Sequence, residues 1–229
     1  MYRVRGWAFR RAVTEAHGGP PPPSLRVLDI GSGTGFYIDA WRRLGVRDVV
    51  ASDLTATAVQ QLAERYASTC VHQIDVSAPE IRVPEAPFDA VSIMDVLFHV
   101  VDDDRYAAAL DNIASLLKPR GMVILTENLV PSRVDGRHQV HRSRDEIRRA
   151  LAQSGLQPIA ERPMFCLMNA PVASSSRLLS AWWDCLIRIV RQNEMLGWVA
   201  GAALFPLEVT LLRSTSWAPS SKILICRRP

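Results

Sequence analysis

The sequence predicts an α/β domain with a mostly parallel sheet that carries helices on both faces. Over residues 25–160, short apolar runs alternate with segments of helical periodicity, which is the pattern of strands buried on both faces. A glycine-rich bend directly follows the first apolar run, where an open α/β sheet binds its ligand. The 229 residues, of which 48% are hydrophobic and 22% charged, fit one globular domain with room for an insertion.

The individual elements follow from periodicity and from turn residues. A short basic amphipathic helix is expected at the N-terminus and is ended by Gly18-Gly19 and a run of prolines. Strands are expected at residues 25–30, 48–52, 70–74, 88–94, 122–126, 157–160 and 223–226. Helices are expected at residues 2–16, 36–44, 57–67 and 103–117, and one more before Gly155 that a Ser143/Glu146 capping box begins. Pro119-Arg120-Gly121 predicts a turn before the fifth strand.

Residues 166–220 interrupt the alternation, because they separate the last two strands by far more than an ordinary connection. The sequence is therefore divided into an N-terminal helix and proline-rich linker (1–24), a core (25–165), an apolar helical insertion (166–220) and a final strand (221–229). The insertion fits three roles: a lid over an apolar substrate, a packing or homodimer face, or a contact with a membrane surface. No membrane span is expected, because its longest apolar stretch holds Pro206 and Glu208.

Charge and cysteine content exclude several classes of protein. The net charge is +4 with arginines spread along the chain, so no nucleic-acid partner is expected. Cys70, Cys166, Cys185 and Cys226 show no C-x-x-C pair or zinc spacing and are interpreted as reduced and mostly buried. The first residues lack the apolar segment of a signal peptide, so a cytoplasmic location is expected.

The glycine-rich bend reads Asp29-Ile30-Gly31-Ser32-Gly33-Thr34-Gly35. Its glycines allow a sharp turn and a close approach of ligand to backbone N–H groups, and the helix that follows favours an anion at its N-terminus. The spacing is G-x-G-x-G after an acid, whereas dinucleotide-binding loops have G-x-G-x-x-G, which disfavours an NAD(P)-dependent oxidoreductase.

Residues 27–35 resemble the first motif of class I S-adenosylmethionine-dependent methyltransferases. Four more matches follow in the order of that family: Asp53 after the second strand, Asp75-Val76 after the third, residues 88–95 along the fourth, and residues 116–121 before the fifth. The resemblance covers about residues 25–160. It implies a Rossmann-like seven-stranded sheet whose last strand is antiparallel, here with a helical insertion before that strand.

The resemblance implies S-adenosylmethionine as cofactor and S-adenosylhomocysteine as product. Asp53 would accept from both ribose hydroxyls, Asp75 from the adenine amine, and Asp29 would orient the glycine bend. The expected cofactor-binding residues are Asp29, Gly31, Ser32, Gly33, Gly35, Asp53, Leu54, Asp75, Val76, Met94 and Asp95. Asp95 with Glu127 partly matches the metal-binding carboxylates of catechol methyltransferases, but aspartate usually stands where this chain has Glu127, and no metal is expected.

Methyl transfer requires alignment of nucleophile and methyl group and, for some acceptors, removal of a proton. The candidates for that base are His99, Glu127 and His141, and the candidates for substrate contact are Phe98, Trp182 and Trp183. The predicted reaction is methylation of an oxygen, or secondarily a nitrogen, of a small apolar metabolite, with specialised metabolism in a GC-rich bacterium as its setting. The alternatives are an RNA or protein methyltransferase, although no N-P-P-Y-like motif follows the fourth strand, and a non-catalytic cofactor-binding partner protein.

Overall fold

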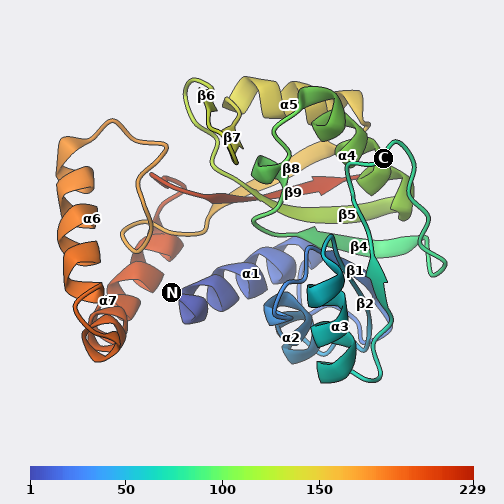
Figure 1. The fold of residues 1–229 in the computed structure, drawn as a ribbon, viewed down its shortest axis with the longest axis horizontal. Coiled ribbons are helices and arrows are strands. Elements are labelled where there is room, and N and C mark those ends of the chain that lie inside the picture. Colours follow the sequence, from blue (N-terminus) through green and yellow to red (C-terminus); the bar gives the residue numbers. More distant parts are fainter.

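The computed structural model describes residues 1–229 and has a seven-stranded sheet at its centre (Figure 1). The strand order is β3-β2-β1-β4-β5-β9-β8, and only β9 runs antiparallel to its neighbours. The strands of this sheet are β1 (Arg26–Ile30), β2 (Asp48–Asp53), β3 (Val71–Gln73), β4 (Phe88–Ile93), β5 (Leu117–Glu127), β8 (Gln157–Pro163) and β9 (Lys222–Arg227). The helices are α1 (Tyr2–His17), α2 (Phe36–Arg43), α3 (Ala56–Arg65), α4 (Asp103–Leu116), α5 (Arg144–Gln153), α6 (Arg177–Val190) and α7 (Glu194–Ser214).

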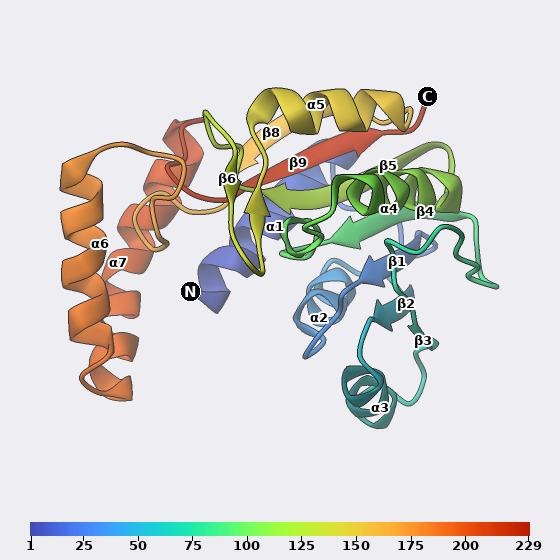
Figure 2. The ribbon, with the colours of Figure 1, turned by 45° about the horizontal axis from the view of Figure 1, so that its top comes forward.

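Helices cover both faces of the sheet, as Figure 2 shows, with α4 and α5 on one side and α1 and α2 on the other. Trp41 of α2 is fully buried, packs edge-on against Phe9 of α1, and donates a 2.9 Å hydrogen bond from Nε1 to Ser92 Oγ on β4. Removal of a buried aromatic side chain of this kind costs about 3–5 kcal/mol. α1 is therefore part of the core packing of the domain.

The predicted seven-stranded α/β fold with an antiparallel last strand is confirmed. The predicted turn at Pro119-Arg120-Gly121 differs, because β5 begins at Leu117 and these residues form a bulge inside it. The reason is that Phe88 pairs with Leu117 while Ala90 pairs with Met122, so the intervening residues have no partners in β4. The short hairpin of β6 (Val134–Asp135) and β7 (Val140–His141) was not predicted, since two-residue strands leave no periodic pattern.

The four cysteines are free, but the expectation that they are mostly buried is wrong for two of them. Cys166 and Cys226 are buried, whereas Cys70 and Cys185 are exposed. Cys70 immediately precedes β3, which is an edge strand, and Cys185 lies on an exposed face of α6. An apolar sequence context therefore did not imply burial at these positions.

α6 and α7 lie between β8 and β9 in the chain and pack against each other beside the sheet (Figures 1 and 2). Glu208 of α7 is buried and accepts hydrogen bonds from the backbone N–H groups of Cys166 and Leu167, at 2.6 and 2.9 Å. α7 is the one helix whose length and composition would suffice to cross a membrane, yet only 11% of its most apolar window is buried. The pair of helices is thus anchored at one end and exposed over much of its apolar surface.

Candidate active site

A cavity of about 450 Å³ opens at the carboxyl ends of β1 to β4. Parallel strands bring their carboxyl ends to one edge of the sheet, so residues far apart in sequence meet there. The cavity is lined by Ile30, Gly31, Asp53, Leu54, Thr55, Ile74, Asp75, Val76, Ser77, Asp95, Val96, His99, Val100, Val101, Asp102 and Arg105. It combines apolar walls with four carboxylates, a composition suited to a ligand with apolar and hydrogen-bond-donating parts.

The glycine bend contributes Gly31 to the lining of this cavity. Gly31 has φ 71°, and a side-chain carbon there would collide with Val96 Cγ2 across the cavity. Gly35 has φ 85°, caps α2, and would collide with the ring of Tyr66 if it carried a side chain. Glycine is therefore favoured at both positions, because the backbone is left-handed there and a neighbouring side chain leaves no room for a Cβ atom.

Asp29 lies behind the bend and not in the cavity. It is 1% exposed, accepts a hydrogen bond from Ser92 Oγ at 2.5 Å, and its other oxygen has no partner. Burial raises the pKa of Asp29 to about 6, although the hydrogen bonds of Ser92 and Ser32 oppose that rise. This position fits the predicted role of orienting the bend.

Asp53 at the end of β2 connects the bend to the next loop. One of its oxygens accepts the backbone N–H of Gly33 at 3.0 Å, and the other accepts the backbone N–H of Thr55 at 3.0 Å. The carboxylate is thereby fixed at the edge of the cavity, where further lone pairs remain available to hydroxyl donors.

Asp75 after β3 is held by Ser77 and Arg105. Ser77 Oγ donates to it at 2.6 Å, and the Arg105 guanidinium pairs with its second oxygen at 2.5 Å. Burial opposes ionisation of Asp75, but these hydrogen bonds and the Arg105 charge outweigh it and lower the pKa. An adenine amine would share this carboxylate with Arg105, a partner that the sequence did not suggest.

Arg5 of α1 forms an ion pair with Asp95, which lines the cavity. Asp95 has φ 60°, and its backbone N–H donates to Thr126 Oγ1 at 2.5 Å, which ties the loop after β4 to β5. Arg5 is a functional candidate that sequence reasoning missed. The only signal in the sequence was the basic character of the N-terminal helix.

Two histidines stand at the outer rim of the site. His99 lines the cavity and its Nδ1 lies 3.2 Å from the carbonyl oxygen of His138. His141 Nδ1 lies 2.8 Å from Asn128 Nδ2, while Asn128 Oδ1 accepts from Ser221 Oγ at 2.8 Å. Burial, and secondarily the charge of His99, lowers the pKa of His141. The ring of Phe98 lies between them, 4.7 Å from His99 and 6.0 Å from His141 between ring centroids.

Glu127 does not lie in the cavity, and its prediction as a catalytic base requires correction. It is 1% exposed and accepts a 3.0 Å hydrogen bond from the hydroxyl of Tyr106 on α4. Successive strand residues point to opposite faces of the sheet, and Glu127 points toward α4. Burial raises its pKa to about 7.

The comparisons with known proteins agree with this geometry. The chain matches the family model described as a methyltransferase domain over residues 27–121. It is 39% identical over 115 residues to a ubiquinone biosynthesis O-methyltransferase of Xanthomonas campestris pv. campestris, a match that covers 48% of this chain and 46% of that protein. It is 30% identical over 176 residues to a protein of the same name from Chelativorans sp., covering 65% of this chain and 68% of that one.

The chain belongs to the class I S-adenosylmethionine-dependent methyltransferases. It spans about half the length of the first curated relatives that it matches.

Several solved structures share the fold. A methyltransferase from Mesorhizobium loti superposes with a TM-score of 0.58 at 16% identity, covering 98% of both chains. The 1,6-didemethyltoxoflavin-N1-methyltransferase of Burkholderia thailandensis gives 0.56 at 18% identity, covering 97% of this chain and 78% of that one. The [4+2]-cyclase SpnF superposes with a TM-score of 0.56 at 16% identity, covering 96% of this chain and 92% of that one. The fold alone therefore does not specify the reaction.

Some of the predicted cofactor residues line the cavity and others do not. Gly31, Asp53, Leu54, Asp75, Val76 and Asp95 line it. The remaining residues do not line it: Ser32, Gly33 and Gly35 complete the bend, and Asp29 and Met94 are buried. No group of three or more His, Cys, Asp or Glu side chains is arranged to hold a metal ion.

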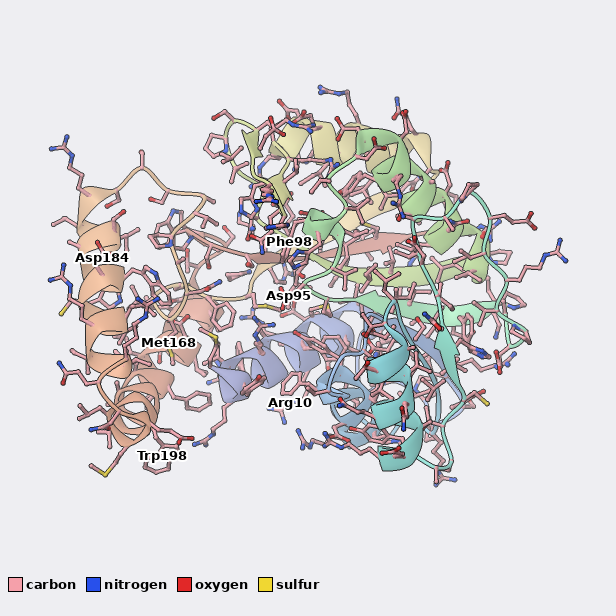
Figure 3. The ribbon with its side chains drawn as sticks, in the orientation of Figure 1. Arg10, Asp95, Phe98, Met168, Asp184 and Trp198 are labelled. Carbon is pink, nitrogen blue, oxygen red and sulfur yellow. The ribbon has the colours of Figure 1, made fainter.

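The predicted substrate contacts lie in two separate places in the molecule. Phe98 lies beside Asp95 at the centre of the molecule, whereas Asp184, the neighbour of Trp183, marks α6 far to one side (Figure 3). Trp182 is 38% exposed and donates from Nε1 to the carbonyl oxygen of Leu167 at 3.0 Å. Neither tryptophan lines the cavity.

Proposed function

We propose that this protein transfers the methyl group of S-adenosylmethionine to an oxygen of a small, apolar metabolite. The observation that carries the proposal is the convergence of Gly31, Asp53, Asp75 and Asp95 on one cavity at the carboxyl ends of the strands. The names of the curated relatives support oxygen as the acceptor atom. That the acceptor molecule is small and apolar is part of the proposal.

The residues of the cavity fit the cofactor part by part. Asp53 would accept from the ribose hydroxyls, and Leu54 and Val76 would flank the adenine, whose amine would donate to Asp75. Arg5 would hold the carboxylate of the methionine end, and the absence of a side chain at Gly31 leaves room for that end beside Val96. When bound, S-adenosylmethionine supplies an activated methyl group and its own leaving group.

The hydrogen bonds of the two histidines support different roles for them. The carbonyl of His138 can only accept, so His99 donates from Nδ1 and its Nε2 keeps a free lone pair that can take a proton from an acceptor hydroxyl. Asn128 Oδ1 accepts a hydrogen bond from the Ser221 hydroxyl, so the Asn128 NH₂ group donates to His141 Nδ1. Neutral His141 then carries its proton on Nε2 and can donate to the substrate but cannot act as its base. We therefore favour His99 as the general base.

Two measurements test the proposed function. Isothermal titration with S-adenosylmethionine, S-adenosylhomocysteine and NAD should show saturable binding of the first two only. Release of S-adenosylhomocysteine should then depend on an added acceptor, tested with phenols and amines of matched size, each with and without an alkyl chain. Cofactor binding with no turnover on any acceptor would favour the non-catalytic partner protein, and turnover on RNA or a protein alone would favour the macromolecular alternative.

A further inference from the structure

A second hollow, of about 280 Å³, lies outside the proposed active site between α1, α2 and α7. Its lining contains three arginines, four aromatic side chains and no acid: Tyr2, Arg3, Gly6, Trp7, Arg10, Phe36, Ala40, Arg43 and Phe205. We call it the arginine groove. None of its residues has a role in the proposed methyl transfer.

The arginines of the groove are exposed and have no carboxylate partner. Arg5 and Arg11, on the same helix, are both in ion pairs, with Asp95 and Glu15, whereas Arg3, Arg10 and Arg43 are in none. Arg3 stacks over the ring of Phe205 at 4.6 Å. Three unneutralised guanidinium groups at one hollow create a positive potential that favours an anionic partner.

The groove continues into the exposed apolar surface of α7. Phe205 lies two helical turns after Trp198, so both project from the same side of the helix. Trp198 is 74% exposed and Met195 is 69% exposed at the start of α7. Figure 3 places Trp198 and Arg10 along the same edge of the molecule, while Asp184 lies higher on α6. The edge therefore joins a cationic hollow to a broad apolar strip that carries a tryptophan.

We propose that this edge, consisting of the arginine groove and the exposed side of α7, docks on an anionic phospholipid bilayer. Arginines would bind the lipid phosphates, and Trp198 with its aliphatic neighbours would enter the interfacial region, where tryptophan is favoured. α7 packs on α1 and α6, but only 11% of its most apolar window is buried, so most of that apolar surface is free to enter an apolar environment.

The contacts of α7 indicate that it lies along the membrane surface and does not cross it. Glu208 near its carboxyl end is fully buried and fixed by two backbone N–H groups of the domain. Release of this carboxylate would leave those donors unpaired. The aliphatic composition of the strip also favours lipid over single-stranded nucleic acid, which would need stacking aromatics beyond the groove.

Co-sedimentation of the full chain with vesicles tests this proposal. Vesicles of phosphatidylcholine mixed with phosphatidylglycerol should bind the protein, whereas phosphatidylcholine alone should bind it at least about five-fold more weakly, and added salt should remove the difference. Arg10→Glu and Arg43→Glu should each lower the partition coefficient by about five-fold or more. Arg149→Glu, a matched change on α5, should leave it unchanged.

Tryptophan fluorescence provides a second readout, which reports whether Trp198 is the residue that enters the bilayer. Vesicle binding should shift the emission to shorter wavelength, and Trp198→Phe should lose most of that shift while still sedimenting. Unchanged affinity for S-adenosylmethionine in all four variants would show that they fold and that the outcome is independent of the proposed reaction. The proposal would be overturned by equal binding to both kinds of vesicle, or by a loss of binding in Arg149→Glu as large as in the groove variants. It would also be overturned by binding to an oligonucleotide in preference to vesicles, or by a stable dimer that excludes vesicles.

Discussion

The carboxylate of Asp53 accepts a hydrogen bond from the backbone N–H of Gly33, 3.0 Å away, and so ties the end of β2 to the glycine bend after β1. The predicted ribose-binding acid is therefore also a structural part of the bend that receives the methionine end of the cofactor. Loss of this carboxylate should affect both parts of the site.

Asp53→Ala should weaken binding of S-adenosylmethionine by about 1.5–3 kcal/mol, because charge-assisted hydrogen bonds to the ribose are removed. Isothermal titration would measure the loss. Asp48→Ala is a suitable control, since Asp48 is an exposed acid at the other end of the same strand and pairs with Arg26. Equal affinities for Asp53→Ala and the unmodified protein would contradict the assignment of the cavity.

Gly31→Ala should reduce cofactor affinity because its methyl group would meet Val96 in the cavity. The left-handed backbone adds about 1–2 kcal/mol of strain, which is a stability effect. Gly45→Ala separates the two effects, since Gly45 also has a positive φ, 92°, but has nothing near its missing side chain. Titration with S-adenosylmethionine should show a loss of affinity for Gly31→Ala and a partial recovery of that affinity in Gly31→Ala/Val96→Ala. Gly45→Ala should bind S-adenosylmethionine with unchanged affinity. Failure of the double variant to recover would place the bend outside the binding site.

Sequence patterns predicted the order of strands and the acids at their ends well, and the physical reason is local. Asp53 is the last residue of β2 and Asp75 lies two residues after the end of β3, and the carboxyl ends of parallel strands necessarily share one edge. The capping box at Ser143 is likewise a property of four consecutive residues and is present as expected.

The parts of the site that were not predicted depend on tertiary contacts. Arg5 could not be recognised, because its approach to Asp95 depends on how α1 docks against the sheet. Glu127 was misplaced because sequence did not reveal which of two neighbouring residues, Glu127 or Asn128, faces the substrate side. The position of Trp182 depends on the packing of α6 beside the domain, for which helical periodicity gives no direction.

Arg5→Gln should weaken binding of S-adenosylmethionine and S-adenosylhomocysteine about equally, because both share the amino-acid end that Arg5 would hold. Binding of methylthioadenosine, which lacks that end, should be unchanged. Asp53→Ala should weaken all three ligands, so the pair of variants maps the orientation of the cofactor. A comparable loss of methylthioadenosine affinity in Arg5→Gln would show that Arg5 acts through the fold and not through the ligand.

Glu127→Gln should change how stability depends on pH. Burial raises the pKa of Glu127 to about 7 from an ordinary value of 4.5. The protonated carboxyl therefore stabilises the fold, and this contribution is complete below about pH 4.5 and is lost as pH rises through about 7. Its full size is about 3 kcal/mol.

Urea unfolding near pH 5 and near pH 8 should show that Glu127→Gln loses less stability than the unmodified protein across this range. The amide keeps an acceptor for the Tyr106 hydroxyl. The exposed Glu64→Gln should behave like the unmodified protein. Turnover of Glu127→Gln should stay within a few-fold of normal, and a large loss of turnover with intact stability would restore Glu127 as a catalytic candidate.

His99→Ala should reduce turnover by about 10²-fold or more if Nε2 takes the proton of the acceptor. The deficit should shrink as pH approaches about 10, where a phenol ionises without help from the protein. His141→Asn should give a smaller loss that does not depend on pH in this way, because His141 is assigned as a donor. Rates with a phenol acceptor from about pH 6 to 10 would separate the two variants. A deficit in His99→Ala that is constant with pH would mean that this ring packs beside Phe98 and leaves the proton to water.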